Sequence, residues 1–309
     1  MFIGNGYVTP YKYNGSAFTR HGVPMASSSG MTGAVSGGAS LTTDTYYYKV
    51  AFVNAQAAIG DVSTATTGFV IATASGAVNL TSIPVAPTSH GVGSRRIYRA
   101  NTTTAASFGL LATLADNTTT TYSDTGSVTP SAAPPTDNGE PPRYNVICYH
   151  QGRLFCNDLI NPGYVWYSEI NEPYTFGSTN FRGIGDQTRD LVKGLEVYNN
   201  AVLVTCETST HLIYMPSTDP TDWQVIRIMT PFGSRSPYAS FLYENKVMVA
   251  AMQNGKFIGF GAISGTSVDP AATLLTTSAA GSELQSDRVE PDMFQVQEAY
   301  VGNVSAMVF

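Results

Sequence analysis

Short runs of alternating hydrophobic and polar residues follow one another through the first half of the chain, separated by Gly, Pro and Asn. In TYYYKVAFV (45–53), every second residue from Tyr46 to Phe52 is aromatic or aliphatic, so these side chains share one face of a strand. Further strands are predicted at 68–73, 77–83, 95–101, 108–115 and 119–125. Strands of this kind, with turn residues between them, predict an antiparallel β-sandwich between residues 41 and 128.

A longer pattern repeats in the region 143–309. Tyr149 begins YHQGRLFCND, Tyr198 begins YNNAVLVTCE and Tyr243 begins YENKVMVAAM. These copies start 49 and 45 residues apart, and a further copy, YVGNVSAMVF, begins at Tyr300. A period of about 40–50 residues with several strands per unit is typical of β-propeller blades, which bury their faces by stacking on neighbours around an axis.

The remaining segments complete the expected domain organisation. Residues 1–36 begin with MFIGNGYVTPYKYNG, which predicts a hairpin, and the Gly/Ser-rich tract 25–40 predicts a linker. We expect an all-β fold in which propeller-like blades, formed by 1–36 together with 143–309, are interrupted by a sandwich at 37–142. The first and last segments would share one blade, giving about four blades. Either the sandwich is inserted into a small propeller, which we favour, or the sequence is part of a larger propeller protein.

Composition and charge narrow the function. Hydrophobic residues make up 43% of the chain and charged residues only 12%, with a net charge of −6. A protein that coats nucleic acid would be basic, whereas a weakly acidic wall suits a channel through which DNA slides without binding. Arg95, Arg96 and Arg99 form the only arginine cluster, and their spacing fits a strand with solvated outward charges at least as well as a phosphate site.

The cysteines and the hydropathy indicate the cellular compartment in which the protein is made. Cys148, Cys156 and Cys206 are odd in number and lie in strand-like contexts, so we interpret them as buried apolar residues in a reducing compartment. The sequence has neither a secretory leader pattern nor an apolar run long enough for a membrane helix. We therefore expect synthesis in the cytoplasm and no membrane anchor.

Four residues of the first repeat resemble a zinc site, because thiolate and imidazole together suit zinc. Cys148 and His150 lie on one face of a strand, and Cys156 and Asp158 on one face of the next. The close ligand pairs of structural zinc sites are absent, however. Cys156 also aligns with Thr205 and Ala250 in the sister repeats, and neither of these is a usual zinc ligand. We predict no metal and no cofactor.

Catalytic candidates are equally weak. Glu169 and Glu172 in SEINEP could supply the two carboxylates of a glycoside hydrolase, but Glu172 precedes a proline in a turn sequence. Neither GIGDQTRD (183–190) nor DPTDW (219–223) matches a phosphate, dinucleotide or Ca²⁺ loop.

A nucleophilic set can be assembled from one serine, one histidine and one aspartate. The candidates are Ser168, His211 and either Asp186 or Asp190, but the sequence has no Gly-x-Ser-x-Gly elbow to select them. We predict no catalytic residues and no enzymatic activity.

A resemblance to a known family rests on five stretches, LTTDTYYYKVAFVN, SRRIYRAN, LLATLADNTTTTYSDTG, PPTDNGEPPRYNVICYHQGRLFCND and VWYSEINEPYTF. Together they resemble tail structural proteins of tailed bacteriophages. More narrowly, they are similar to the β-propeller tail-hub or nozzle proteins of short-tailed phages, which carry an inserted immunoglobulin- or fibronectin-III-like domain. The resemblance extends from about Phe2 to Phe260 and consists of packing and turn motifs, so the family offers no catalytic residues to carry over. Its members are usually longer.

The resemblance implies a virion tail protein that assembles as a homo-oligomeric ring, often a hexamer, below the portal and its adaptor. Such a ring continues the DNA ejection conduit, with DNA passing non-specifically, and its sandwich projects outward to neighbouring tail proteins or fibres. Two alternatives remain. One is a host-glycan adhesin, although only Trp166 and Trp223 are available as tryptophan contacts. The other is a propeller glycosidase, which needs carboxylates converging in a central pocket.

Overall fold

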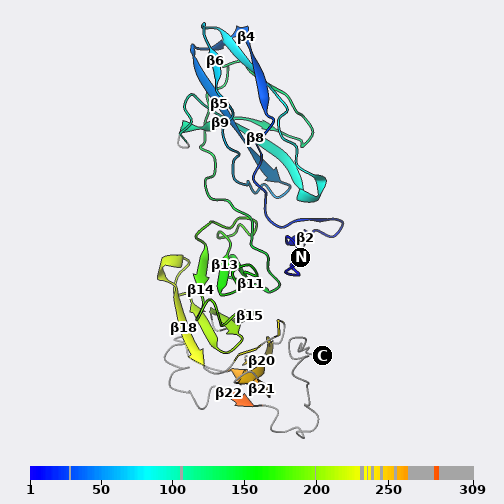
Figure 1. Ribbon diagram of the computed structural model, residues 1–309, viewed down its shortest axis with the longest axis vertical. Coiled ribbons are helices and arrows are strands. Elements are labelled where there is room, and N and C mark those ends of the chain that lie inside the picture. Colours follow the sequence, from blue (N-terminus) through cyan, green and yellow to red (C-terminus); the bar gives the residue numbers. More distant parts are fainter. Residues whose placement is uncertain are drawn as a thin grey trace. The chain divides into compact units, whose positions relative to one another are not determined.

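The structure is a computed structural model. It describes residues 1–27, 29–104, 107–198, 200–229, 233–234, 236–237, 240–243, 246–253, 256–263 and 282–284. These residues form several antiparallel sheets and only short 3-10 turns, so the predicted all-β fold is confirmed (Figure 1).

The chain divides into two compact units that exchange segments. The first unit contains 1–2, 11–141 and 174–178, and the second contains 3–10, 142–173 and 179–309. These bounds differ from the expected ones, because most of 1–36 groups with the expected sandwich region and not with 143–309.

Two sheets make up most of the first unit. One has the order β10-β7-β4, formed by β4 (Thr32–Leu41), β7 (Gly76–Thr81) and β10 (Tyr122–Asp124). The other has the order β6-β5-β8-β9, formed by β5 (Asp44–Asn54), β6 (Phe69–Ile71), β8 (Val92–Ala100) and β9 (Gly109–Leu114). Each predicted strand between residues 45 and 125 is present, within a few residues of its expected ends.

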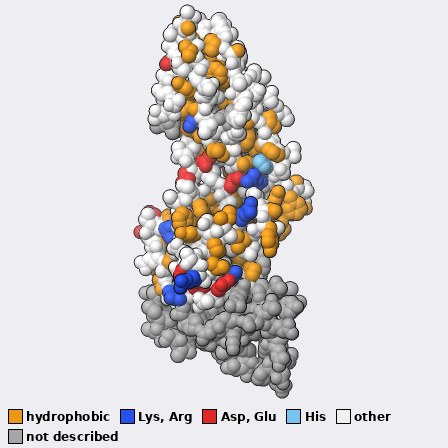
Figure 2. All heavy atoms as spheres, in the orientation of Figure 1, with side chains coloured by type: hydrophobic (Ala, Val, Ile, Leu, Met, Phe, Trp, Pro, Cys, Tyr) orange, Lys and Arg blue, Asp and Glu red, His pale blue; other side chains and the backbone are white. Residues whose placement is uncertain are grey.

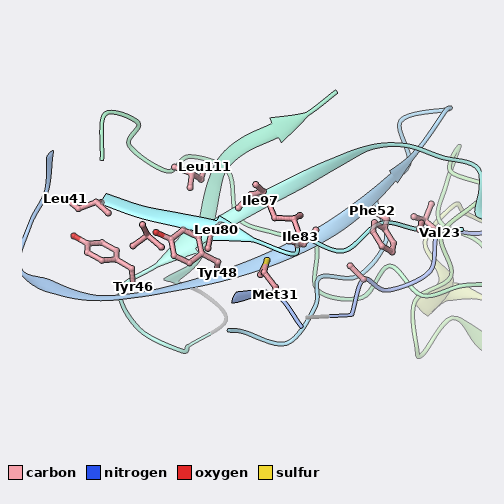
Figure 3. Close-up of a cluster of buried hydrophobic side chains, with 14 of the residues drawn as sticks. Val23, Met31, Leu41, Tyr46, Tyr48, Phe52, Leu80, Ile83, Ile97 and Leu111 are labelled. Atoms are coloured by element: carbon pink, nitrogen blue, oxygen red, sulfur yellow. The ribbon is translucent and has the colours of Figure 1, made fainter. Parts of the chain in front are cut away.

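One hydrophobic cluster joins these two sheets (Figure 3). Tyr48 and Val50 of β5 are fully buried in it, as are Val78 of β7 and Ile97 of β8. The two-residue period read from 45–53 is therefore correct, since the residues it placed on one face all belong to this core. Burial of side chains from both sheets is what holds a sandwich together.

The prediction of a linker at 25–40 is wrong for residues 32–40, which belong to strand β4. Because its residues are small, β4 can pair closely with β7: a Cβ on Gly33 would lie 2.8 Å from the Asn79 carbonyl oxygen. Hydroxyl and amide side chains link the strands further, with Thr32 Oγ1 3.0 Å from Thr81 Oγ1 and Asn79 Nδ2 donating to Ser36 Oγ at 3.0 Å. Pairing with β7, and not the composition of the segment, decides its structure.

The two strands predicted within residues 1–15 correspond to β1 (Phe2–Ile3) and β2 (Tyr11–Tyr13), which are neighbours in a sheet. A strand that was not predicted, β3 (Phe18–Arg20), pairs antiparallel with β2 and makes the sheet three-stranded. In the same unit, the buried His21 ring lies 4.4 Å from Phe2 and 5.9 Å from Phe176, measured between ring centroids. The segment 174–178 thus joins the first unit through aromatic packing.

Three four-stranded sheets follow one another in the second unit, each with its strands in sequence order. The first contains β11 (Ile147–His150), β12 (Arg153–Asn157), β13 (Tyr164–Tyr167) and β14 (Phe181–Gly183). The second contains β15 (Val192–Tyr198), β16 (Ala201–Cys206), β17 (Thr210–Tyr214) and β18 (Gln224–Met229). The third contains β19 (Ser240–Tyr243), β20 (Lys246–Gln253), β21 (Lys256–Ile263) and β22 (Ser282–Leu284). We call these three sheets the meanders.

The repeat read from the sequence corresponds to the first hairpin of each meander. Tyr198 and Tyr243 end the first strands of the second and third meanders, and each pairs across a two-residue loop. In the first meander the equivalent residue is His150, which pairs with Arg153 across Gln151-Gly152. The predicted equivalence of Tyr149 is therefore one residue out of register, and Tyr149 is exposed whereas Tyr198 is buried.

This shift changes the alignment of the first repeat with its sisters. Counting from the hairpin loops, Cys156 corresponds to Val204 and Val249, and not to Thr205 and Ala250. The copy predicted at Tyr300, and with it the C-terminal part of the expected shared blade, lies outside the described residues.

Candidate functional site

A cluster of titratable side chains lies at one end of the second meander, and it is the strongest candidate for chemistry in the described residues. Cys206 ends β16, and a tight turn, closed by the Cys206 amide donating to the Ser209 carbonyl at 2.8 Å, leads into β17. His211 is the second residue of β17, and Asp190 lies just before β15. We call Asp190, Cys206, Ser209 and His211 the hairpin cluster.

Ser209 is the centre of the hairpin cluster. Its hydroxyl donates to the Asp190 carboxylate, and its Oγ lies 2.7 Å from Nε2 of His211. The other Asp190 oxygen accepts the Thr208 amide at 2.7 Å. With the hydroxyl proton directed at Asp190, His211 donates from Nε2, so the network is satisfied by a neutral imidazole.

The electrostatics agree with this arrangement. Burial lowers the pKa of His211, and the positive charge of Arg227 on the neighbouring strand lowers it further, against the opposing effect of Asp190. Burial, together with the charge of Asp190, raises the pKa of Cys206 well above that of a free thiol. At neutral pH the imidazole is therefore uncharged and the thiol protonated.

The hairpin cluster has the donor types of a metal site, because the candidate ligand atoms of Asp190, Cys206 and His211 lie within 4.8 Å of one another. No other such group occurs among the residues that the structure describes. The Ser209 hydroxyl, however, already bonds both Asp190 and His211, so these two side chains are satisfied without an ion. The cluster therefore fits a structural hydrogen-bond network better than a metal centre.

The nucleophilic set assembled from the sequence comes together only in part. His211 and Asp190 are neighbours, but the serine beside them is Ser209 and not Ser168. Asp190, Ser209 and His211 are all buried, with Ser209 at 0% exposure, so a substrate has no access to the hydroxyl. Ser209 could have been found from the sequence, since it precedes His211 by two residues and alternate residues of a strand share a face.

The other two members of that set have local structural roles. The Ser168 hydroxyl donates to the Glu169 carbonyl at 2.9 Å and accepts the Leu154 amide at 3.0 Å. Asp186 accepts the hydroxyl of Thr188 at 2.8 Å and the amide of Thr188 at 3.1 Å. Both therefore hold turns and strand ends in place.

The four zinc-like residues of the first repeat do not converge. Cys148 pairs with Phe155 and Cys156 with Ile147 across adjacent strands, so the two thiols point to opposite faces of the sheet. Asp158 accepts the amides of Ile160 and Asn161 at 2.8 and 3.0 Å. The Trp166 indole N–H also donates to Asp158, at 3.1 Å.

The paired glutamates lie at a tight turn. Glu169 and Glu172 form an isolated bridge, with the Glu172 amide donating to the Glu169 carbonyl at 3.2 Å. The Glu169 carboxylate accepts a hydrogen bond from Asn180 Nδ2 at 2.6 Å and lies 3.6 Å from Arg153 Nη1. Glu169 is thus engaged in structural contacts.

Arg95 and Arg99 of β8 match neither sequence-based interpretation, whereas Arg96 is partly exposed on the other face of the strand. Arg95 and Arg99 are buried on the core face, on either side of Ile97, and are not solvated outward charges. Arg95 donates to the carbonyl oxygens of Pro84 and Thr119 at 2.9 and 2.6 Å. It also contacts Asp116 at 3.2 Å. With these donors used inside the protein, Arg95 is not free to bind phosphate.

Arg99 forms a buried charge network. Its Nη1 donates to both carboxylate oxygens of Asp124 at 2.8 Å, and its Nη2 donates to the Val128 carbonyl at 3.0 Å. The Tyr48 hydroxyl donates to the same carboxylate at 2.8 Å. Burial, reinforced by the charge of Asp124, raises the pKa of Tyr48, so it stays a donor. This network ties β5 and β8 of one sheet to β10 of the other.

An open cavity of about 310 Å³ lies in the first unit. It is lined by Met25, Lys49, Asp61, Val62, Pro134, Pro135 and Thr136. The Lys49 ammonium lies 4.6 Å from the centroid of the Phe108 ring, and the Asp61 carboxylate accepts the Asn138 amide at 2.7 Å. Both charged groups of the lining are therefore already engaged.

No protein-family model matches the chain, and no curated protein matches it. Among the described residues, no helix is long and apolar enough to cross a membrane.

Proposed function

We propose that this chain is a non-enzymatic structural component of a bacteriophage virion tail, of the hub or nozzle type. In this proposal the meanders are blades of a β-propeller, and the sandwich of the first unit is the immunoglobulin- or fibronectin-III-like domain. The observation that carries the proposal is the succession of three four-stranded antiparallel sheets at the spacing of the sequence repeat. This is the strand order that propeller blades use.

Contacts between the meanders support the same interpretation. The first strand of the second meander, β15, contacts the first strands of both neighbours, β11 and β19. In a propeller the equivalent strands of successive blades converge towards the axis, which agrees with these contacts. Burial of all six residues of β16 also fits a sheet that is covered on both faces.

The chemistry of the described residues favours a structural role over catalysis. Ser209, His211 and Asp190 are satisfied by one another, and Glu169 is held by Asn180 and Arg153. Active sites instead keep a nucleophile or acid accessible to substrate.

The surface agrees with a conduit that does not retain DNA. Figure 2 shows a face that is mostly uncharged, with Lys and Arg in small groups mixed with Asp and Glu. Binding to nucleic acid depends mainly on phosphate contacts from clustered basic residues. A wall with a net charge of −6 lets DNA pass without holding it. In the proposed virion, the chain contacts copies of itself in a ring such as a hexamer, and it also contacts neighbouring tail proteins.

Two measurements on the full chain test this proposal. Mass spectrometry of purified virions is expected to detect the chain at a few to a dozen copies per particle, and cryo-electron microscopy should place it in the tail. Absence of the chain from purified virions would overturn the proposal, whatever its oligomeric state in solution.

A further inference from the structure

Strand β4 has one long side with no partner in the first unit. It forms the edge of the sheet β10-β7-β4, and residues 32–37 pair with β7 in a continuous register (Figure 1). Among the described residues, no backbone hydrogen bond joins Thr32–Gly37 to any strand other than β7. The N–H and C=O groups on the far side of these residues are therefore available to another strand.

The other edges of the two sheets are short or covered. The outer edge of β9 is occupied, because the Leu110 amide donates to the Ala132 carbonyl at 2.9 Å and the Ser131 amide donates to the Leu110 carbonyl at 3.0 Å. β6 and β10 have only three residues each. Among the described edges of these two sheets, β4 is thus the one long edge that remains open.

The sequence of β4 lacks the usual protection of an open edge. Natural edge strands carry charged residues or proline to prevent pairing with other chains. Thr32–Leu41 contains neither, and its side chains are small. Val35 pairs with the buried Val78 and so shares its core-side face, yet Val35 is 45% exposed.

We propose that β4 is an interface between two copies of this chain, paired antiparallel about a two-fold axis at Val35. In this register Val35 lies opposite the partner's Val35, and Gly33 lies opposite the partner's Gly37. The pairing completes the hydrogen bonds of both edges and shields both half-exposed valines. It makes one six-stranded sheet from two three-stranded ones.

A second copy is the occupant that the described residues favour. A two-fold contact uses the same surface twice, and β4 is the one long open edge among the described strands of the two sandwich sheets. The absence of charge matters here, because a chain with a net charge of −6 repels its copies over most other surfaces. Small and β-branched side chains pack well in directly opposed positions of antiparallel strands.

This inference does not depend on the proposed function. A two-fold contact closes on two copies, so it is separate from the lateral contacts of a cyclic ring. Failure of the β4 pairing would leave the presence of the chain in virions unaffected, and the reverse is also true.

The first test is the mass of the full chain in solution, measured by light scattering during size exclusion over a hundredfold range of concentration. We expect the wild type to reach twice 32.9 kDa at high concentration. Val35→Lys places two like charges opposite each other and should weaken dimerisation at least tenfold. Val70→Lys is the matched control, since Val70 is a valine of β6 that is 61% exposed and lies off this edge. A wild-type monomer throughout, or equal dimerisation of both variants, would overturn the proposal.

The second test fixes the register and does not require a charge in the strand. Opposed residues of antiparallel strands lie at distances that allow a disulfide. Val35→Cys should therefore form an intermolecular disulfide under mild oxidation, visible as a dimer on a non-reducing gel. The wild type and Val70→Cys should not form it to a comparable extent. Circular dichroism checks that each variant is folded, and a folded Val35→Cys that fails to cross-link would contradict the pairing at this residue.

Discussion

Strand β5 of the first unit alternates buried and half-exposed side chains from Tyr46 to Val50, whereas every residue of β16 in the second unit is buried. The first pattern belongs to a sheet with one face on the large core and the other only partly covered, by a smaller cluster of Ala51, Tyr98, Ala100 and Phe108. The second belongs to a sheet covered on both faces. Different sequence patterns therefore specify the strands of the two units. Period-two alternation specifies β5 in the first unit, and a short continuous apolar run specifies β16 in the second.

The polar groups inside the two units also differ. The first unit buries the charges of Arg99 and Asp124, which hold its two sheets together. The hairpin cluster of the second unit keeps His211 and Cys206 neutral through burial and hydrogen bonds. Loss of Asp124 should consequently cost more than loss of the Ser209 hydroxyl, because Arg99 is left without a carboxylate whereas Asp190 keeps its hydrogen bond from the Thr208 amide.

The largest effect is expected for Asp124→Ala. The substitution leaves the Arg99 guanidinium and the Tyr48 hydroxyl buried without their acceptor, which should lower the free energy of unfolding by about 3–5 kcal/mol. Hydrogen exchange of peptides from β5 and β8 would measure the loss within the first unit. Asp116→Ala serves as the control, since its side chain is 44% exposed and Arg95 keeps other acceptors. Equal losses of stability in the two variants would contradict the larger cost expected for breaking the buried Arg99 network.

Leu203→Ala examines the double-sided burial of β16. Leu203 is 1% exposed although it points away from the face that carries Val202 and Val204. Its truncation should therefore cost about 2–5 kcal/mol, as in a core. Val70→Ala, on the half-covered sheet of the first unit, should stay within about 0.5 kcal/mol. Tryptophan fluorescence during urea unfolding reports on the Leu203 variant, because both tryptophans lie in the second unit. A loss below 1 kcal/mol would mean that the second face is open.

Ser209→Ala tests whether the hairpin cluster is a hydrogen-bond network. Without its hydroxyl, the Asp190 carboxylate and the His211 imidazole each lose a partner, which should cost about 1–3 kcal/mol. Zinc added to the wild type should leave the melting temperature unchanged. Ser217→Ala, which removes an exposed hydroxyl bonded to Asp222 at 2.6 Å, is the control. A melting temperature that rises with zinc would instead identify a metal centre.

The smallest effect is a pH dependence at Glu196. Burial raises the pKa of this carboxyl to about 7, with the Ser240 hydroxyl opposing the shift. Because the folded-state pKa lies above the unfolded value, stability is greatest below the unfolded pKa and is lost as the pH rises through about 7.

Glu196→Gln removes that loss, since glutamine stays neutral. The variant should therefore melt above the wild type at pH 8 and nearly level with it at pH 4. Glu207→Gln is the control, with its carboxylate 3.1 Å from Lys193 on the protein surface. A Glu196→Gln difference that shrinks with rising pH contradicts the assigned sign.

The strands of the first unit could be predicted because alternation is a local property of the sequence. The burial of Arg95 and Arg99 was also readable: they flank Ile97 at two-residue steps, so all three share the core face. Strand β4 could not be predicted, because glycine and serine give no periodic signal and pairing with β7 decides its structure.

In the second unit, the sequence repeat located the first hairpin of each meander but missed the register of the first copy by one residue. Gln151 and Gly152 both have positive φ, at 45° and 77°, and this tight two-residue turn places His150 where Tyr198 lies in the next copy. Only part of the hairpin cluster was predicted from the sequence: His211 and Asp190 were named as candidates, but Ser209 was not. Asp190 reaches Ser209 and His211 through the arrangement of strands, which no short motif encodes.

The exchange of segments between the two units bears on how the protein responds to a broken backbone. A protease cut after Pro141 separates the polypeptide into two pieces, yet neither piece is a whole unit. The N-terminal piece keeps 3–10 of the second unit, where the Gly6 amide bonds the Tyr144 carbonyl at 3.0 Å. The C-terminal piece keeps 174–178 of the first unit, where Phe176 packs on His21. Each fragment therefore supplies part of the unit that the other fragment mainly forms, and the two fragments should stay associated. Nicked protein should give two bands on a denaturing gel and a single peak on a sizing column.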